Sequence, residues 1–271
     1  MILKNPDGTE TYYTTIGSTD GHTLVLLHGI GADHAMWQPQ LERYAAEGYR
    51  LLALDLFGHG RSSKLTSLDL ADWHNQINWL LDDQGIEICT LIGASMGGVI
   101  AQSFVAQDSS RVERIVITDS FGELRTFQEK LLGLSAVLGF SLFKLLGTGM
   151  LAKGMRSTYK ATYAQQAQDY FVQVSSTIDL EQMILARKAI NQINCLDSLH
   201  KVSIPALVIV GADFGQSFVE INQKIADALP NAEFVILDQS MDPSNLVNPV
   251  EFDRHVLPFL KVRKQSLVES N

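Results

Sequence analysis

The sequence contains little cysteine. Its two cysteines, Cys89 and Cys195, lie far apart in a chain of 271 residues. Two thiols cannot form a disulfide framework, so a reducing compartment is expected. Residues 1–13 contain no apolar segment of the kind found in a signal peptide. Together these observations predict a cytoplasmic protein.

Positive charge is also scarce. The chain has 21 Lys and Arg against 30 Asp and Glu, which gives a net charge of -9 and a pI of about 5.2. A balance of this sign argues against nucleic acid as a partner and against anionic membrane surfaces.

A long hydrophobic run is missing as well. The most apolar stretch, residues 131–146, is interrupted by two glycines and a lysine. It is too short to cross a bilayer, so no membrane span is expected. We interpret this stretch as a buried or pocket-facing helix, with contact to a membrane surface as the alternative.

Short apolar segments rich in β-branched residues alternate with amphipathic helical segments. The chain is 46% hydrophobic, enough to build a sizeable core. Near-continuous apolar strands that alternate with helices indicate a parallel sheet covered on both faces, an α/β fold. Residues 9–17 are expected to add an antiparallel edge strand. The buried strands are expected over residues 23–29, 50–56, 89–95, 114–120, 206–213 and 232–238.

One long segment breaks this alternation. Residues 121–203 have a helical composition with no strand-like run, which is too much chain for one crossover between parallel strands. We therefore expect a core formed by residues 1–120 and 204–271, and a helical cap formed by residues 121–203. The cap would cover the carboxyl ends of the strands, where an open α/β sheet holds its ligand.

Residues Gly93-Ala94-Ser95-Met96-Gly97 match the G-x-S-x-G nucleophile elbow. In such an elbow a serine sits on a sharp turn between a strand and a helix, and small neighbours prevent clashes. The apolar stretch before the motif and the helical stretch after it fit this context. Ser95 is therefore the candidate nucleophile.

The loop after the first central strand reads His28-Gly29-Ile30-Gly31. Together with the elbow, it resembles the α/β-hydrolase superfamily, in particular capped small-molecule members such as 3-oxoadipate enol-lactonases, esterases and C–C hydrolases. The resemblance covers nearly the whole chain and implies an α/β-hydrolase fold. It also implies that the backbone N–H groups of Ile30 and Met96 form the oxyanion hole. His28 would then brace the loop.

The resemblance also implies a carboxylate after the strand at 206–211. The usual place, three residues past Gly211, is occupied by Phe214, and the nearest carboxylate is Asp213. We take Asp213 as the candidate acid because a loop easily absorbs a shift of one residue. Asp119, after the strand at 114–120, is the alternative, since some hydrolases place the acid there.

The catalytic histidine of the superfamily is absent from its usual position. Counting back from Pro249 at the start of the last helix, that position holds Asp242, and no histidine occurs in residues 201–254. None of the seven histidines is expected to serve Ser95, although His34 could reach into the pocket. They are His22, His28, His34, His59, His74, His200 and His255.

Three explanations for Asp242 stay open at the level of sequence. An engineered replacement would impair an ordinary serine hydrolase, which the intact elbow and oxyanion loop favour. A natural His-less protein could instead run acid/base chemistry, as an isomerase or lyase does. A third possibility is a small-molecule binding or receptor protein on the same fold. A serine hydroxyl without its base is a poor nucleophile.

The resulting hypothesis is hydrolysis of a small, fairly apolar ester, lactone or related carbonyl compound by a monomer or homodimer. No metal or organic cofactor is expected, because the sequence has neither a ligand cluster nor a phosphate-binding glycine loop. The apolar side chains of the cap suggest a lipophilic substrate, with packing of the cap helices on one another as the equal alternative. The pocket is expected to include His28, Gly29, Phe121, Leu138 and Phe214.

Overall fold

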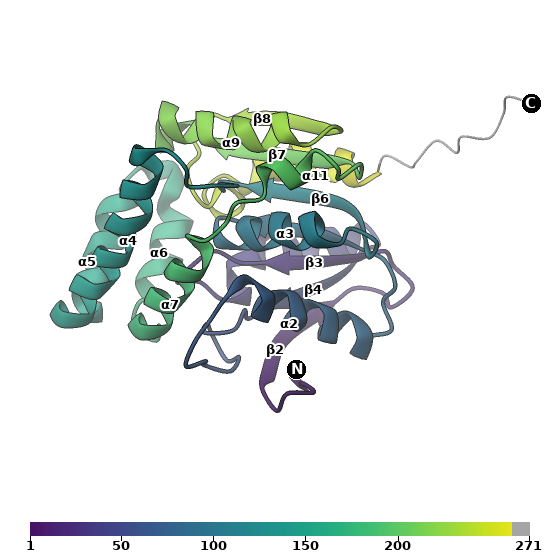
Figure 1. Ribbon diagram of the computed structural model, residues 1–271, viewed down its shortest axis with the longest axis horizontal. Helices are drawn as coiled ribbons and strands as arrows, with labels where there is room; N and C mark the ends of the chain where they lie inside the picture. The colour runs from purple at the N-terminus through teal and green to yellow at the C-terminus, as the bar shows by residue number, and fades with distance from the viewer. Residues whose placement is uncertain (262–271) are drawn as a thin grey trace, which may run out of the picture.

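The computed structural model describes residues 1–261, except for the side chains of Gln128 and Leu132. The described chain forms an eight-stranded sheet with the strand order β1-β2-β4-β3-β5-β6-β7-β8 (Figure 1). The pairs that involve β1 and β2 are antiparallel, and all the others are parallel. The strands are β1 (Ile2–Lys4), β2 (Glu10–Ile16), β3 (Thr23–Leu27), β4 (Arg50–Leu54), β5 (Cys89–Ala94), β6 (Val112–Thr118), β7 (Ala206–Gly211) and β8 (Ala232–Leu237).

The predicted α/β fold is confirmed, with one difference at the edge of the sheet. Strand β2 was expected to be the edge strand, but β1 pairs outside it, with Ile2 opposite Tyr12. A strand of three residues is too short to give a recognisable alternation in the sequence, which explains why β1 was not predicted.

Two apolar layers pack on the two faces of the sheet. Along β3, Val25 and Leu27 belong to one buried cluster, while Leu24 and Leu26 belong to the other. Because neighbouring residues of a strand point to opposite faces, a strand covered on both sides is apolar throughout. Helices α2 (Leu70–Asp83), α3 (Met96–Gln107) and α9 (Gln216–Ala228) cover the first face, and α1 (Gln38–Ala46) and α11 (Pro249–Lys261) cover the second.

Helices also make up the long segment between β6 and β7. They are α4 (Phe127–Leu146), α5 (Thr148–Thr158), α6 (Gln165–Val174), α7 (Leu180–Ile190) and the short α8 (Leu196–Leu199). Within residues 121–203 the described structure has a single β-bridge, between Glu123 and Asn194. In Figure 1, helices α4 to α7 stand together at one end of the sheet, beside the carboxyl ends of the parallel strands. This arrangement supports the expected division into core and cap, which stays a prediction.

The inserted helices are tied to the core by a polar contact at the first loop. The Oη of Tyr170 on α6 accepts a hydrogen bond of 2.8 Å from the Asp33 N–H and donates one of 2.9 Å to the Asp33 Oδ1. This contact holds α6 beside the loop that follows β3.

Candidate active site

Ser95 stands on a strained turn between β5 and α3. Its φ of 52° and ψ of -114° lie outside the regions that ordinary residues prefer. A Cβ on Gly93 would lie 2.3 Å from the Gly97 carbonyl oxygen, and a Cβ on Gly97 would lie 2.0 Å from the Leu27 carbonyl oxygen. Only glycine fits at these two places, so the turn has the local geometry expected of a nucleophile elbow.

The Ser95 side chain is hydrogen-bonded to Asp242. Its Oγ lies 2.9 Å from Asp242 Oδ2, although the two residues are far apart in the sequence. Asp242 is on the loop between β8 and the short helix α10 (Ser244–Val247). The position counted back from Pro249 is therefore next to the serine, as the sequence predicts.

Asp119 lies at the end of β6, fully buried, and accepts four hydrogen bonds. Its Oδ1 accepts from the Gly211 N–H at 2.8 Å and from the Ser244 hydroxyl at 3.0 Å. Its Oδ2 accepts from the Ser244 N–H at 2.6 Å and from the Thr118 hydroxyl at 2.9 Å. Four donors satisfy a carboxylate completely, so this site favours the ionised form of Asp119.

Asp119 and Asp242 influence each other's ionisation. Burial, followed by the negative charge of Asp119, raises the pKa of Asp242 well above its usual value, and the Ser95 hydrogen bond offsets only part of this shift. Burial also raises the pKa of Asp119, while its four donors act in the opposite direction. Because Asp119 has four donors and Asp242 has one, the negative charge of the pair rests on Asp119. Burial and the charge of Asp119 both favour the protonated form of Asp242.

The candidate acid Asp213 lies away from this pair. Its Oδ2 accepts a 2.5 Å hydrogen bond from the hydroxyl of the partly buried Tyr163, and the Asp213 side chain is exposed to solvent. Asp213 belongs to a 3-10 turn (Ala212–Phe214) beyond the end of β7, where the one-residue offset turns its side chain outward. The structure thus brings the alternative, Asp119, to Asp242 and Ser95.

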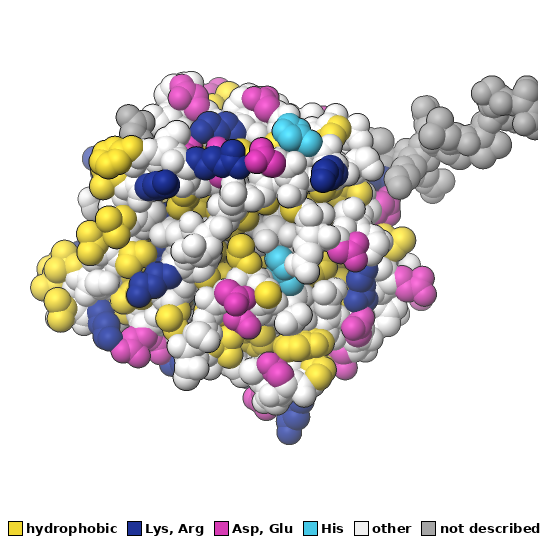
Figure 2. Space-filling view, in the orientation of Figure 1, with side chains coloured by type: hydrophobic (Ala, Val, Ile, Leu, Met, Phe, Trp, Pro, Cys, Tyr) yellow, Lys and Arg dark blue, Asp and Glu magenta, His cyan; other side chains and the backbone are white. Residues whose placement is uncertain are grey.

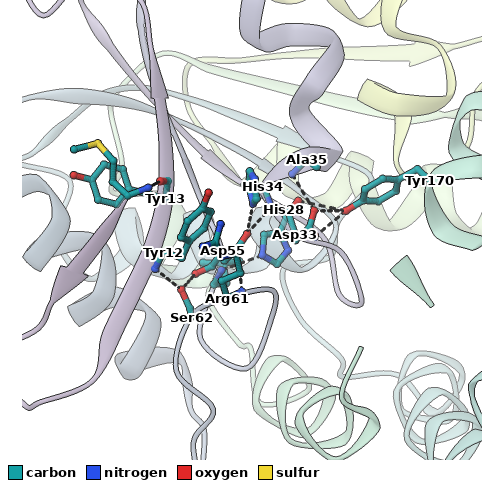
Figure 3. Close-up of polar contacts among 12 residues, drawn as sticks. Tyr12, Tyr13, His28, Asp33, His34, Ala35, Asp55, Arg61, Ser62 and Tyr170 are labelled. Atoms are coloured by element: carbon teal, nitrogen blue, oxygen red, sulfur yellow. Dashed lines mark hydrogen bonds and ion pairs between the residues drawn. The ribbon is translucent and has the colours of Figure 1, made fainter. Parts of the chain in front are cut away.

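His34 does not take the place of the missing catalytic histidine beside Ser95. His34 was considered as a side chain that could reach the pocket, but its Nδ1 lies 2.6 Å from Asp55 Oδ1 (Figure 3). The Asp55 carboxylate raises the pKa of His34 and also accepts the Arg61 N–H at 2.8 Å. His34 is therefore held in a cluster of its own, away from Ser95.

His28 braces the loop after β3. Its Nδ1 lies 2.7 Å from the Gly29 carbonyl oxygen, and its Nε2 accepts the Leu56 N–H at 3.0 Å. An acceptor at Nε2 and a donor at Nδ1 require the neutral ring, and burial lowers the pKa of His28 in agreement. The ring fixes the backbone just before Ile30.

The expected oxyanion donors are the backbone N–H groups of Ile30 and Met96. Among the described residues, no acceptor is hydrogen-bonded to the N–H of Ile30 or to that of Met96. Met96 begins α3, so its N–H lies at the positive end of a helix of 12 residues. Such an end stabilises negative charge beside Ser95.

An apolar cavity of about 220 Å³ opens in front of Ser95 and Asp242. Most of its wall is aliphatic or aromatic, and the inserted helices supply about half of it. Its lining consists of Gly29, Ile30, Gly31, Met36, Ser95, Phe140, Leu151, Met155, Thr158, Tyr159, Phe171, Ser175, Ile178, Phe214, Asp242 and Pro243.

Two of the five predicted pocket residues, Gly29 and Phe214, line this cavity. His28 is buried behind the loop. Phe121 is also buried, beneath the guanidinium of Arg187, which lies 5.2 Å from the ring centroid. Leu138 is 59% exposed on the outer face of α4. Residues two apart on a helix point in nearly opposite directions, so Phe140 lines the cavity in place of Leu138.

Two residues of the inserted helices contribute to the site without any signal in the sequence. The hydroxyl of Tyr159 donates a 2.8 Å hydrogen bond to the backbone carbonyl of Asp242. Arg187 is the cation that attracts Asp242, and burial lowers the pKa of Arg187 to about 10, which leaves it charged at neutral pH. Neither residue belongs to a recognisable motif, so only the folded chain reveals them.

Replacing Asp242 by asparagine is expected to stabilise the protein, and more so at higher pH. A raised pKa in the folded state contributes stability below the unfolded pKa of about 3.9, and this contribution is lost as the pH rises through the folded pKa. Asparagine does not ionise and still offers an oxygen to Ser95. Thermal unfolding should show a Tm gain of a few degrees near pH 8 and little change near pH 4. Equal gains at both values would contradict the raised pKa.

Within residues 1–261, no group of three or more His, Cys, Asp or Glu side chains is arranged to hold a metal ion. No described helix is long and apolar enough to cross a membrane.

Comparison with known proteins agrees with the fold. The family profile described as alpha/beta hydrolase fold matches residues 22–249. The 3-oxoadipate enol-lactonase 1 of Acinetobacter baylyi is 22% identical over 96% of this chain and 97% of its own length. A pimeloyl-[acyl-carrier protein] methyl ester esterase of Vibrio vulnificus is 26% identical over 93% of this chain and 98% of its own length. The crystal structure of the enol-lactonase of Burkholderia xenovorans superposes with a TM-score of 0.85 at 22% identity, covering 97% of this chain and 100% of that one.

Proposed function

Because the chain belongs to the α/β-hydrolase family, we propose that it hydrolyses a small, fairly apolar ester, lactone or related carbonyl compound at Ser95. The observation that carries this proposal is the 2.9 Å hydrogen bond between Ser95 Oγ and Asp242 Oδ2, at the wall of an apolar cavity. Relatives named as an enol-lactonase and an ester esterase support the substrate class.

The proposed reaction uses Asp242 as the proton acceptor. Ser95 Oγ attacks the substrate carbonyl while its proton passes to ionised Asp242, and the N–H groups of Ile30 and Met96 hold the oxyanion. Protonated Asp242 then returns the proton to the leaving group, and water releases the acyl group by the same route. Asp119 holds its charge throughout.

Burial gives Asp242 a useful property for this role. An ordinary aspartate, with a pKa of about 3.9, is a weak base near neutral pH. A carboxyl group with a raised pKa is a stronger base once it ionises, although a smaller fraction of it is ionised. We therefore expect slow turnover that increases with pH.

The experiment that tests the proposal is burst kinetics with p-nitrophenyl acetate. The wild-type chain is expected to release about one equivalent of p-nitrophenol per protein rapidly, followed by a slow phase, as an acyl-enzyme accumulates. Ser95→Ala removes the nucleophile and is expected to abolish the burst. Ser176→Ala, at an exposed serine outside the cavity lining, serves as the matched control and should retain it.

A second candidate function is supported by the burial of Asp242 beside Ser95, which raises the pKa of Asp242 and favours its protonated form. A buried carboxylic acid can donate a hydrogen bond or a proton to a bound carbonyl without forming an acyl-enzyme, as an isomerase, a lyase or a small-molecule binding protein would require. In that case p-nitrophenyl acetate would give no burst with the wild-type chain. Tight binding of an apolar carbonyl compound that weakens in Asp242→Asn would then favour this candidate over hydrolysis.

A further inference from the structure

The outer face of α4 carries an unusual concentration of exposed apolar side chains. Fourteen large hydrophobic side chains are exposed in the described residues, and eight of them lie within residues 127–150. We call this set the α4 stripe: Phe127, Leu131, Leu134, Leu138, Leu142, Leu145, Leu146 and Met150. Steps of three and four residues place the members on α4 along one side of a helix about 30 Å long.

The opposite side of α4 is already occupied. Phe140 and Phe143 pack against Leu151, Leu180 and Met183 of the neighbouring helices. A helix that is apolar on every side is normally buried on every side. Here the α4 stripe is exposed in the part of the chain that the structure describes, and an exposed apolar patch of this extent marks an interaction surface.

The segment that carries the α4 stripe has a net charge opposite in sign to that of the rest of the chain. Residues 127–160 contain five basic residues and a single acidic one, Glu129, a net charge of +4. Since the whole chain carries -9, the remainder carries -13. Glu129 is buried and paired with Lys224, so it does not face solvent. The basic residues are Lys130, Lys144, Lys153, Arg156 and Lys160.

These basic side chains are available to a partner. All five are exposed, and within residues 1–261 only Lys144 has an ion-pair partner, Glu181. Figure 2 shows hydrophobic side chains gathered over α4 and α5 at the left of the view, with Lys and Arg side chains among them. An apolar face bordered by basic residues is the pattern of a helix that lies in the interface of an anionic membrane.

We propose that α4 and α5 bind the surface of an anionic lipid bilayer, with α4 lying parallel to the membrane plane. A second copy of the chain fits this surface less well, because it would bring another net charge of +4 against the first. The negative charge of the whole chain, which argues against such surfaces, is concentrated outside these two helices.

The membrane-binding helices also form a wall of the catalytic cavity. Phe140 on α4 and Leu151, Met155 and Thr158 on α5 line the cavity in front of Ser95. A lipophilic substrate dissolved in the bilayer would therefore meet the protein on the side where the cavity is built. This part of the inference, that the substrate enters from lipid, rests on the proposed hydrolytic function.

The test is flotation with lipid vesicles. The purified chain is expected to float with vesicles of phosphatidylcholine and phosphatidylglycerol, and not with phosphatidylcholine alone. Replacing Leu131, Leu138 and Leu142 together by serine is expected to reduce the bound fraction at least about tenfold, since three apolar anchors are removed. Replacing Ile88, Ile236 and Val250 by serine is the matched control, because these exposed residues lie outside the α4 stripe.

Charge reversal tests the electrostatic part. Lys130→Glu with Lys153→Glu is expected to abolish binding to the anionic vesicles, whereas Lys4→Glu with Lys201→Glu changes net charge equally and leaves binding intact. The proposal would be overturned if the wild type bound neutral and anionic vesicles equally well. It would also be overturned if the two double charge-reversal variants lost binding to anionic vesicles to the same extent. A third contrary result would be a wild-type protein that is a dimer in light scattering and binds neither kind of vesicle, and that becomes monomeric when Leu131, Leu138 and Leu142 are replaced by serine.

Failure of the hydrolase proposal gives a different result. The burst with water-soluble p-nitrophenyl acetate, measured without vesicles, is expected to be the same in the leucine variant and the wild type. Absence of the burst with normal flotation would count against hydrolysis alone. A normal burst without flotation would count against the membrane surface alone.

Discussion

Replacing Asp242 by histidine is expected to raise the rate of ester hydrolysis by at least about 10³-fold, because loss of the triad histidine costs about 10⁶ in kcat in a Ser-His-Asp protease. The residue at position 242 already contacts Ser95 through its side chain. An imidazole with a pKa near neutrality is largely unprotonated at pH 7 to 8, whereas burial and the charge of Asp119 raise the pKa of Asp242 and favour its protonated form. The measurement is kcat/KM on a panel of small esters and lactones.

The structure also provides the acid that such a histidine needs. Asp119 is buried, accepts four hydrogen bonds that favour its ionised form, and lies close enough to Asp242 to raise the pKa of Asp242. To donate to Asp119, an imidazole N–H would displace one of the two hydroxyl donors, Thr118 or Ser244, which can rotate away. The introduced histidine would then complete a triad with Ser95 and Asp119, with the oxyanion donors already in place.

Three controls make this prediction specific. Asp242→Asn removes the carboxylate without adding a base and is expected to show no gain. Ser95→Ala in the histidine background should remove the gain completely. Asp119→Asn in the same background is expected to lower kcat by up to about 10⁴-fold, the cost of the equivalent change in a Ser-His-Asp protease, while Asp213→Asn should have little effect. An unchanged rate in Asp242→His would show that position 242 is not the base position.

The sequence predicted the parts of the fold and site that rest on local backbone requirements. Strands that are apolar on both faces must be covered on both faces, so the sheet was predictable. The glycines around Ser95 are required by a tight turn, so the elbow was predictable too. Pro249 marks the start of α11, and the distance counted back from it placed residue 242 beside Ser95. Both predictions depend on chain geometry over few residues.

The choice between Asp213 and Asp119 could not be made in this way. Both follow neighbouring parallel strands, β7 and β6, so both lie at the same edge of the sheet. They differ in side-chain direction and in the donors that reach them from distant segments, such as Ser244 and Gly211 for Asp119. The contributions of Tyr159 and Arg187 depend on how the inserted helices pack, which no spacing along the chain encodes.

Asp119→Asn is expected to lower the free energy of unfolding by about 2–4 kcal/mol, which would make Asp119 a structural support as well as part of the site. An asparagine cannot accept all four hydrogen bonds, and its NH₂ group would face a backbone N–H of Gly211 or of Ser244. Asp119 joins the ends of β6 and β7 to the start of α10, so these buried donors have no water to replace the lost acceptor.

Asp213→Asn is the matched comparison. Asp213 is exposed, and the one side-chain hydrogen bond that it makes within residues 1–261 is to the hydroxyl of Tyr163, so its replacement is expected to change the free energy of unfolding by less than about 0.5 kcal/mol. Urea unfolding of both variants measures the difference. A larger loss in Asp213→Asn than in Asp119→Asn would contradict the structural support that we attribute to Asp119.

The same Asp119 substitution has a second, independent consequence at Asp242. Removing the charge of Asp119 removes the repulsion that helps to raise the pKa of Asp242, so that pKa is expected to fall toward its ordinary value. The wild type loses stability as the pH rises through the pKa of Asp242. In Asp119→Asn, the same loss is expected at a lower pH. The proton uptake of the variant, measured by carboxyl titration in NMR, would shift in the same direction. A lower stability with an unchanged Asp242 titration would mean that burial alone sets that pKa, and that Asp119 supports the loop without acting on the residue beside Ser95.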